Sequence, residues 1–184
     1  MRSTLTQLRD LAPLRRLSAV DALRVAEAQA DRLLRLSGVT GPMVSETIIA
    51  ELPHIQIERV VPAQAQAASA WSHGRWLILL NGAEPLGRQR WSLAHELKHI
   101  LDHPLVTILY PHTSARAELA EQVCDYFAAC LLIPRRWLRA AWADGVRDVA
   151  ILARQFGVTP QAVTVRLLQV GLIQPTSHYL VREA

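Results

Sequence analysis

Hydrophobic residues near the start of the chain recur at the spacing of one helix face. Residues 18–37 carry such a stripe, Ser18 is a typical N-cap residue and Gly38 ends the pattern. The stripe consists of Ala22, Val25, Ala26, Leu33 and Leu36. We therefore predict an amphipathic helix that packs against the rest of the molecule, followed by a shorter helix over residues 44–52.

The hydrophobic pattern changes its period at Ile55. Residues 55–61 are rich in β-branched side chains and partly alternate, which predicts a strand. Residues 69–72 and 75–81 predict two more strands, and the intervening His73-Gly74 suits a two-residue hairpin. The sequence thus predicts a small antiparallel sheet of about three strands, with a surface loop over residues 62–68.

Helical patterns follow Asn81 up to the C-terminal residues. Pro85 can begin a helix, Ser114 can cap another, and Pro134 can lie in the first turn of a third. The expected helices cover residues 86–103, 114–132, a segment from 134 onward, 146–156 and 160–170. These elements predict an α+β fold in which a small sheet packs against several helices.

The composition is that of an ordinary globular protein. Of the 184 residues, 51% are hydrophobic and 20% are charged, and a chain of this length can bury a substantial core without a disulfide or a metal ion. The net charge is +4, and Lys98 is the single lysine among many arginines. We attribute the arginine excess to genome composition, because it does not by itself identify a nucleic-acid-binding protein.

Three features predict a cytoplasmic protein without a membrane partner. The longest run of residues without a polar side chain, 126–133, is too short to span a bilayer, and the N-terminal residues contain no apolar signal segment. Cys124 and Cys130 are six positions apart in one predicted helix, which turns by about 600° over that length and separates the thiols. Two free thiols fit a reducing cytosol.

One helical segment contains the pattern His-Glu-x-x-His, formed by His95, Glu96 and His99. Two imidazoles one helical turn apart can reach one zinc ion, and the intervening glutamate can reach a water on that ion without binding the metal. A charged helix with two unrelated histidines is the weaker interpretation, because the apolar neighbours make this helix half-buried and buried histidines need partners. The sequence therefore predicts a zinc site.

A catalytic zinc ion needs a third protein ligand and one open position. Glu121 and Asp125 share a face of the next predicted helix, so Glu121 could bind the ion while Asp125 orients a ligand histidine through its other ring nitrogen. Cys124 is a soft donor, although a small buried residue is its simpler interpretation. Glu118 lacks a carboxylate partner four positions on, which favours a solvated or supporting role. Weaker candidates are His73, His103 and His112.

Residues 152–168 resemble a helix-turn-helix. Gly157 permits the sharp reversal, Thr159 can cap the second helix and Pro160 can begin it. If this helix reads a DNA major groove, the expected contacts come from exposed Gln161, Thr164 and Arg166. The alternative is a helical hairpin packed beside the core, which agrees better with the few basic residues nearby.

The motif helix and the next helix together resemble the ImmA/IrrE family of metallopeptidases. The residues that carry this resemblance are Trp91-Ser-Leu-Ala-His-Glu-Leu-Lys-His-Ile-Leu-Asp-His103 and Glu121-Gln-Val-Cys-Asp-Tyr-Phe-Ala-Ala-Cys-Leu-Leu-Ile-Pro134, preceded by Trp76 to Asn81. The resemblance implies His95 and His99 as zinc ligands, Glu96 as the catalytic acid/base and Glu121 as the third ligand. Lys98 departs from the family pattern, which most often has glycine there.

The resemblance also implies a domain plan. We expect an N-terminal helical segment (1–44), a zincin-like metallopeptidase core (45–142) and a C-terminal helix-turn-helix-like segment (143–184). The implied activity is that of a cytosolic zinc endopeptidase. Its implied substrate is a helix-turn-helix transcriptional repressor, whose cleavage releases a stress, phage or mobile-element programme.

Peptide hydrolysis also requires a place for the substrate and a group that stabilises the oxyanion. Residues 75–81 are our candidate strand for pairing with an extended substrate, and Tyr110, His112 and Tyr126 are candidates for stabilising the oxyanion.

Two alternative functions are a DNA-binding regulator and a toxin–antitoxin component, each with a structural or vestigial metal site. A fourth protein ligand, such as Cys124 or His103, would favour them.

Overall fold

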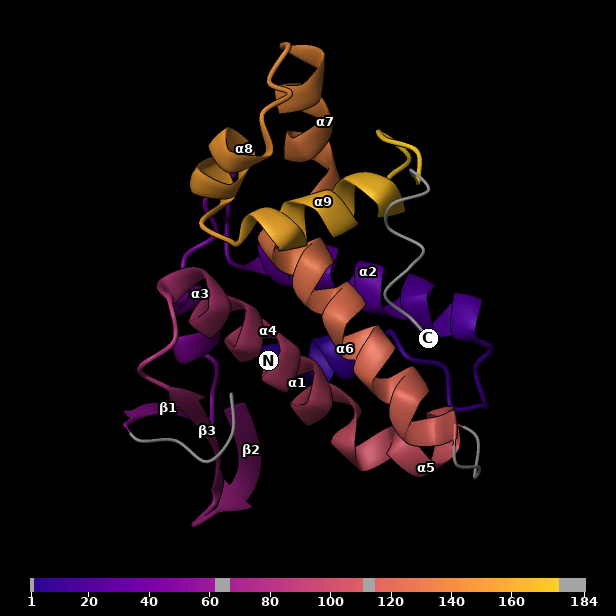
Figure 1. Cartoon of the computed structure of the whole chain (residues 1–184). Helices are drawn as coiled ribbons and strands as arrows, with labels where there is room; N and C mark the ends of the chain where they lie inside the picture. The colour runs from indigo at the N-terminus through magenta and orange to yellow at the C-terminus, as the bar shows by residue number, and fades with distance from the viewer. Residues whose placement is uncertain (1, 62–66, 111–114, 176–184) are drawn as a thin grey trace.

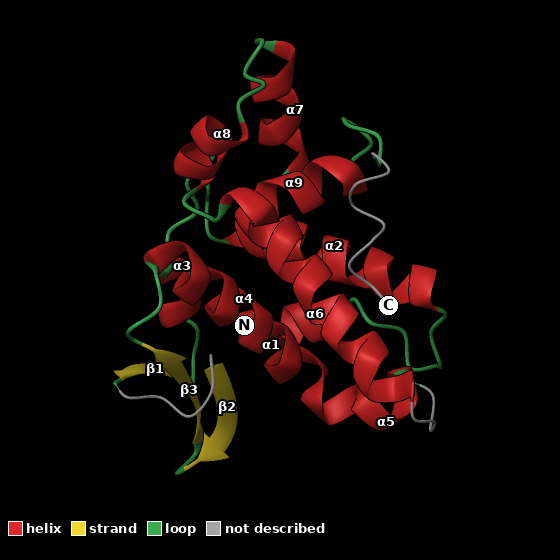
Figure 2. Ribbon diagram, viewed as in Figure 1, coloured by secondary structure: helices red, strands yellow, loops and turns green. Residues whose placement is uncertain are grey.

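The computed structural model describes residues 2–61, 67–110 and 115–175. The elements in these ranges are α1 (Thr4–Arg9), α2 (Ala19–Leu36), α3 (Thr47–Ala50), β1 (Ile55–Val60), β2 (Ala67–Ser72), β3 (Arg75–Asn81), α4 (Leu86–Asp102), η1 (His103–Leu105), α5 (Val106–Leu109), α6 (Ala115–Leu132), α7 (Arg135–Ala143), α8 (Val149–Phe156) and α9 (Pro160–Gln169). The sheet lies at one end of the molecule, α2, α4 and α6 form its centre, and α7 to α9 lie at the other end (Figures 1 and 2). The α+β class predicted from the sequence is confirmed.

The three long central helices enclose most of the hydrophobic core. Helix α6 packs against α2 on one side and against α4 on the other. Three residues of the predicted α2 stripe, Ala22, Ala26 and Leu33, are buried in this core, and Val25 packs against it. Leu36 at the end of the helix is 39% exposed, so its predicted place in the buried face is wrong. The hydroxyl of Ser18 accepts a hydrogen bond from the backbone N–H of Asp21 at 3.1 Å, as an N-cap residue does.

The sheet is mixed, so the predicted all-antiparallel sheet is wrong. Strand β3 lies in the centre, where it pairs parallel with β1 and antiparallel with β2. The physical reason is that β3 is the most apolar strand, with Trp76, Ile78 and Leu80 alternating into the core. His73 and Gly74 both have positive φ angles, 48° and 79°, so the predicted two-residue hairpin is confirmed.

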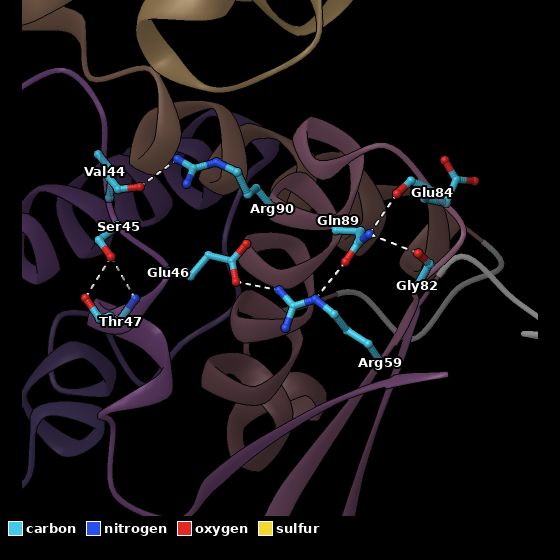
Figure 3. A network of polar contacts seen from close by, with 9 residues as sticks. All are labelled: Val44, Ser45, Glu46, Thr47, Arg59, Gly82, Glu84, Gln89 and Arg90. Atoms are coloured by element: carbon cyan, nitrogen blue, oxygen red, sulfur yellow. Dashed lines mark hydrogen bonds and ion pairs between the residues drawn. The ribbon is translucent and has the colours of Figure 1, made fainter. Parts of the chain in front are cut away.

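A polar network fastens the sheet to the first turns of α4 (Figure 3). The buried amide of Gln89 accepts a hydrogen bond from Arg59 Nε at 2.7 Å, and Arg59 also forms an ion pair with Glu46 at 2.6 Å. The next residue of the same helix is Arg90, whose Nη2 donates to the carbonyl of Val44 at 2.6 Å. These bonds fix the direction of the helix that carries the His-Glu-x-x-His motif.

The last two described helices form the predicted hairpin. Gly157 has a φ of 66°, and the Thr159 hydroxyl caps α9 by accepting from the N–H of Ala162 at 3.2 Å. Arg166 was expected to be exposed, and that prediction is wrong. Its side chain is 1% exposed, and its Nε donates to the carbonyl of Ile133 at 3.2 Å, so it fastens α9 to the end of α6.

All three predicted segments contribute to one hydrophobic core. A single cluster of buried side chains runs from Leu5 in α1 to Val170 after α9. Both cysteines are buried and unpaired.

The sequence pattern did not predict α1 and α5, which are 6 and 4 residues long. It also predicted a longer helix over residues 44–52 than α3, which has 4 residues. Ser114 and most of the predicted 62–68 loop lie outside the described residues. Across the described chain, the helices are too short or too polar to cross a membrane.

Candidate metal centre

The motif side chains of α4 meet a carboxylate from α6. His95 Nε2 lies 3.1 Å from His99 Nε2, because the two rings are one helical turn apart. The carboxylate of Glu121 bridges them, with one oxygen 3.2 Å from His95 Nε2 and the other 3.2 Å from His99 Nε2. The structure thus brings together the three residues expected to bind zinc.

This triangle of three side chains fits a tetrahedral zinc ion. Nitrogen ligands at about 2.0–2.1 Å from such an ion lie roughly 3.3 Å from each other, close to the spacings between these donor atoms. The side chain of Glu121 is 59% exposed, that of His99 33% and that of His95 16%. The group therefore lies at the protein surface, where a water molecule or a substrate can reach an ion.

Cys124 offers a second possible donor to the same histidine pair. Its sulfur and one nitrogen from each of His95 and His99 lie within 4.8 Å of one another. The Glu121 carboxylate lies 3.2 Å from Nε2 of each histidine, and burial raises the pKa of the Cys124 thiol. The 3.2 Å spacings of both carboxylate oxygens favour Glu121 as the third ligand.

Asp125 holds His95 from the side opposite the metal position. The Nδ1–H of His95 donates to Asp125 Oδ1 at 2.9 Å, and the indole N–H of Trp91 donates to the same oxygen at 3.1 Å. Burial alone would raise the pKa of Asp125, but these two hydrogen bonds and the nearby imidazoles lower it. Burial alone would lower the pKa of His95, but the bond to Asp125 and the surrounding carboxylates raise it. The expected orienting role of Asp125 therefore has a geometric basis, and Trp91 supports it.

Glu96 is held by a residue from the sheet. The hydroxyl of Ser69 in β2 donates to Glu96 Oε2 at 2.6 Å. No sequence pattern points to Ser69, because its position beside Glu96 depends on the order of the strands. This contact also bears on substrate pairing. The candidate strand over residues 75–81 is β3, whose two edges are both paired, so the edge strand next to Glu96 is β2 instead.

Lys98 points away from the histidines into the core. Its ammonium group donates to Asp102 at 2.5 Å and to Gln29 of α2 at 2.9 Å, and Tyr110 donates to the other oxygen of Asp102. The lysine is 1% exposed. The residue at the position where the family most often has glycine therefore links α4 to α2 and leaves the face with the histidines free.

Two clefts open on either side of Glu96. The larger, of about 510 Å³, lies between α4, α6 and α9 and includes His95, Glu121 and Asp125. The smaller, of about 360 Å³, includes His99, Cys124 and the aromatic side chains of Trp76 and Tyr110. Together they give an extended molecule access to both sides of the motif.

The other candidate residues lie in different surroundings. His103 packs on Trp76, with ring centroids 4.9 Å apart, and Glu118 is exposed and accepts a hydrogen bond from Gln122. Gln161 is exposed and lines the larger cleft, while the hydroxyl of Thr164 donates to the carbonyl of Pro160. Tyr126 donates to Glu27, His73 lies in the hairpin turn, and His112 lies outside the described residues.

Comparisons with known proteins identify the family and a similar fold. The model of the IrrE N-terminal-like domain (Peptidase_M78) matches residues 53–168. The fold is similar to that of a solved Mycobacterium tuberculosis transcriptional regulator, with a TM-score of 0.63 and 21% identity over 91% of this chain. The match covers 52% of the regulator's chain, so this chain spans about half of it. A comparison with curated protein sequences gave no match. The chain belongs to the IrrE N-terminal-like (Peptidase_M78) family of metallopeptidases.

Proposed function

We propose that this protein is a zinc-dependent endopeptidase with a zincin-like site. His95, His99 and Glu121 would hold the zinc ion, and Glu96 would act as the acid/base. The observation that carries the proposal is the triangle of three side chains, with Glu96 outside it. The two Nε2 atoms lie 3.1 Å apart, and each lies 3.2 Å from one oxygen of Glu121. When bound, zinc supplies a Lewis acid that polarises a peptide carbonyl and lowers the pKa of water.

Three residues around the triangle would support the reaction, each in a different role. Glu96 takes a proton from the attacking water and passes it to the leaving amine. Ser69 fixes one oxygen of Glu96, which holds the carboxylate in place during this transfer. Asp125 keeps the proton of His95 on Nδ1, so that Nε2 remains free to bind metal.

Strand β2 is the proposed pairing site for an extended substrate. One edge of β2 pairs with β3, and the strand carries Ser69 beside Glu96. An extended peptide added to the other edge would bring its backbone along Glu96 and the histidine pair. This arrangement replaces the pairing on residues 75–81 that the sequence suggested.

The proposed substrate is a helix-turn-helix transcriptional repressor. This proposal rests on the resemblance of both motif segments to the ImmA/IrrE family and on the family match. The test substrates are a proteome-derived peptide library and the purified repressor encoded beside this chain's gene, if there is one.

The decisive test compares the wild-type protein with Glu96→Gln after both are loaded with zinc. We expect equal zinc content, because Glu96 is not a ligand, and loss of cleavage by at least about a hundredfold, because the proton acceptor is gone. Products are identified by mass spectrometry, and Glu118→Gln serves as the matched control on an exposed carboxylate. Equal cleavage by the Glu96 variant and the wild type would exclude Glu96 as the base.

A metal site with a structural role, in a DNA-binding regulator or a toxin–antitoxin component, is the second candidate function. The His95, His99 and Cys124 group favours it, since a cysteine ligand is typical of closed zinc sites. The burial of Arg166 removes one of the three side chains expected to contact DNA. Duplex DNA binding that weakens steeply with salt would support the regulator, because it reports phosphate contacts.

A further inference from the structure

Helix α9 presents an exposed stripe to the larger cleft. The stripe consists of Gln161, Val165 and Gln169, which line the cleft together with His95 and Glu121. These three residues are exposed and four positions apart, so they share one face of the helix. The opposite side of α9 is anchored in the core by Arg166. The hairpin that resembles a helix-turn-helix therefore points its exposed face at the candidate active site.

The position of α9 relative to α4 is fixed by close backbone contact. A Cβ atom on Gly87 would lie 3.0 Å from the carbonyl carbon of Val158 and 3.3 Å from the nitrogen of Thr159. The turn between α8 and α9 thus lies directly on the first turn of α4. Arg90, one turn further along α4, also donates to the carbonyl of Phe156 at 3.5 Å. The stripe is held at a set distance from His95, as a recognition surface requires.

We infer that α9 forms the substrate-recognition wall for residues on the C-terminal side of the scissile bond. This inference rests on the proposed peptidase function. Strand β2 runs from Ala67, which lines the larger cleft, past Ser69 beside Glu96 towards Ser72. A peptide that pairs antiparallel with β2 runs the opposite way, so its C-terminal part enters the cleft below α9.

The chemistry of the stripe suits an extended polypeptide. Each glutamine amide can both donate to and accept from a peptide backbone, and Val165 between them offers an apolar contact. Eight residues of helix rise about 12 Å, which matches three to four residues of extended chain at roughly 3.4 Å each. The occupant is therefore a substrate segment of about four residues, read mainly through its backbone and one side chain near Val165.

A charge-swap pair at Val165 tests this inference. Zinc-loaded wild type, Val165→Arg and Val165→Asp are each incubated with the peptide library, and cleavage sites are mapped by mass spectrometry. We expect Val165→Arg to enrich acidic residues, and Val165→Asp basic residues, at one shared position C-terminal to the cut, by about threefold. The matched controls are Val20→Arg and Val20→Asp, at an exposed valine on α2 outside the cleft. Zinc content and thermal stability are measured for every variant.

The outcomes separate this inference from the function on which it rests. Opposite shifts at the same C-terminal position, absent from the Val20 controls, support α9 as the recognition wall. Glu96-dependent cleavage with an unchanged profile, or with a shift on the N-terminal side, overturns the inference and leaves the peptidase function intact. Absence of Glu96-dependent cleavage in the wild type overturns both.

Discussion

Asp125 shows how a single carboxylate can prepare a metal ligand. It accepts hydrogen bonds from His95 and Trp91 at one oxygen, and so sets both the proton position and the orientation of the imidazole. The indole anchors the carboxylate in turn, because Trp91 lies one helical turn before His95 on α4. An ion at the triangle would therefore meet an imidazole that is already oriented, which reduces the cost of binding.

At this residue, we predict that Asp125→Ala lowers zinc affinity by about 10- to 100-fold. Asp125→Asn should retain most of the affinity, since its amide oxygen can still accept the proton of His95 Nδ1. Competition with a chromophoric chelator measures both constants, and Glu118→Ala on the same helix is the control. An unchanged affinity in Asp125→Ala would show that His95 needs no such support.

At the scale of elements, a buried ion pair joins the motif helix to its neighbours. Lys98 and Asp102 are both on α4, and they bond to Gln29 of α2 and to Tyr110 at the end of α5. The side chains of the pair are 1% and 7% exposed. Burial and the adjacent Asp102 carboxylate also raise the pKa of Tyr110, so its hydroxyl remains a donor. Three elements therefore depend on one buried charge pair.

Removing one member of this pair should destabilise the fold. We predict that Lys98→Met lowers the free energy of unfolding by about 3 kcal/mol, because Asp102 is left as an uncompensated buried charge. The double variant Lys98→Met with Asp102→Asn should recover much of that loss, since asparagine is neutral and can still accept from Tyr110. Urea unfolding measures both changes. A Lys98→Met variant as stable as the wild type would mean that Asp102 becomes neutral or solvated at little cost.

Local sequence patterns predicted where helices, strands and turns lie better than they predicted which elements pack against one another. The cap at Ser18, the hairpin at His73 and the turn at Gly157 each depend on nearby residues, and each lies where the sequence placed it. The central position of β3 depends on long-range pairing, which no local pattern records. Ser69 beside Glu96 was missed for the same reason. The burial of Arg166 was missed because its partners, Ile133 and Glu27, are distant in the sequence.

At the scale of the whole molecule, the shared core predicts that the three segments fold together. α2 covers one side of α6, and the buried cluster includes residues from α1 and from α8 and α9. The central segment alone would expose these apolar faces to water. The site depends on this packing, because α6 supplies Glu121 and Asp125 while α4 supplies the histidines.

We therefore predict that a fragment of residues 45–142 does not fold cooperatively. Circular dichroism on heating should show no sigmoidal transition for the fragment, and a clear one for the full chain. Zinc added to the fragment should not restore the transition, because the lost contacts are apolar. A cooperative transition in the isolated fragment would instead establish residues 45–142 as an independent domain.

The ligand set of the bound metal tests the central claim most directly. The X-ray absorption spectrum of the zinc-loaded full chain distinguishes sulfur at about 2.3 Å from nitrogen and oxygen at roughly 2.0–2.2 Å. We predict a spectrum with two imidazoles and only nitrogen or oxygen ligands, unchanged in Cys124→Ala and altered in Glu121→Ala. A sulfur shell that disappears in Cys124→Ala while Glu121→Ala leaves the spectrum unchanged would contradict the account.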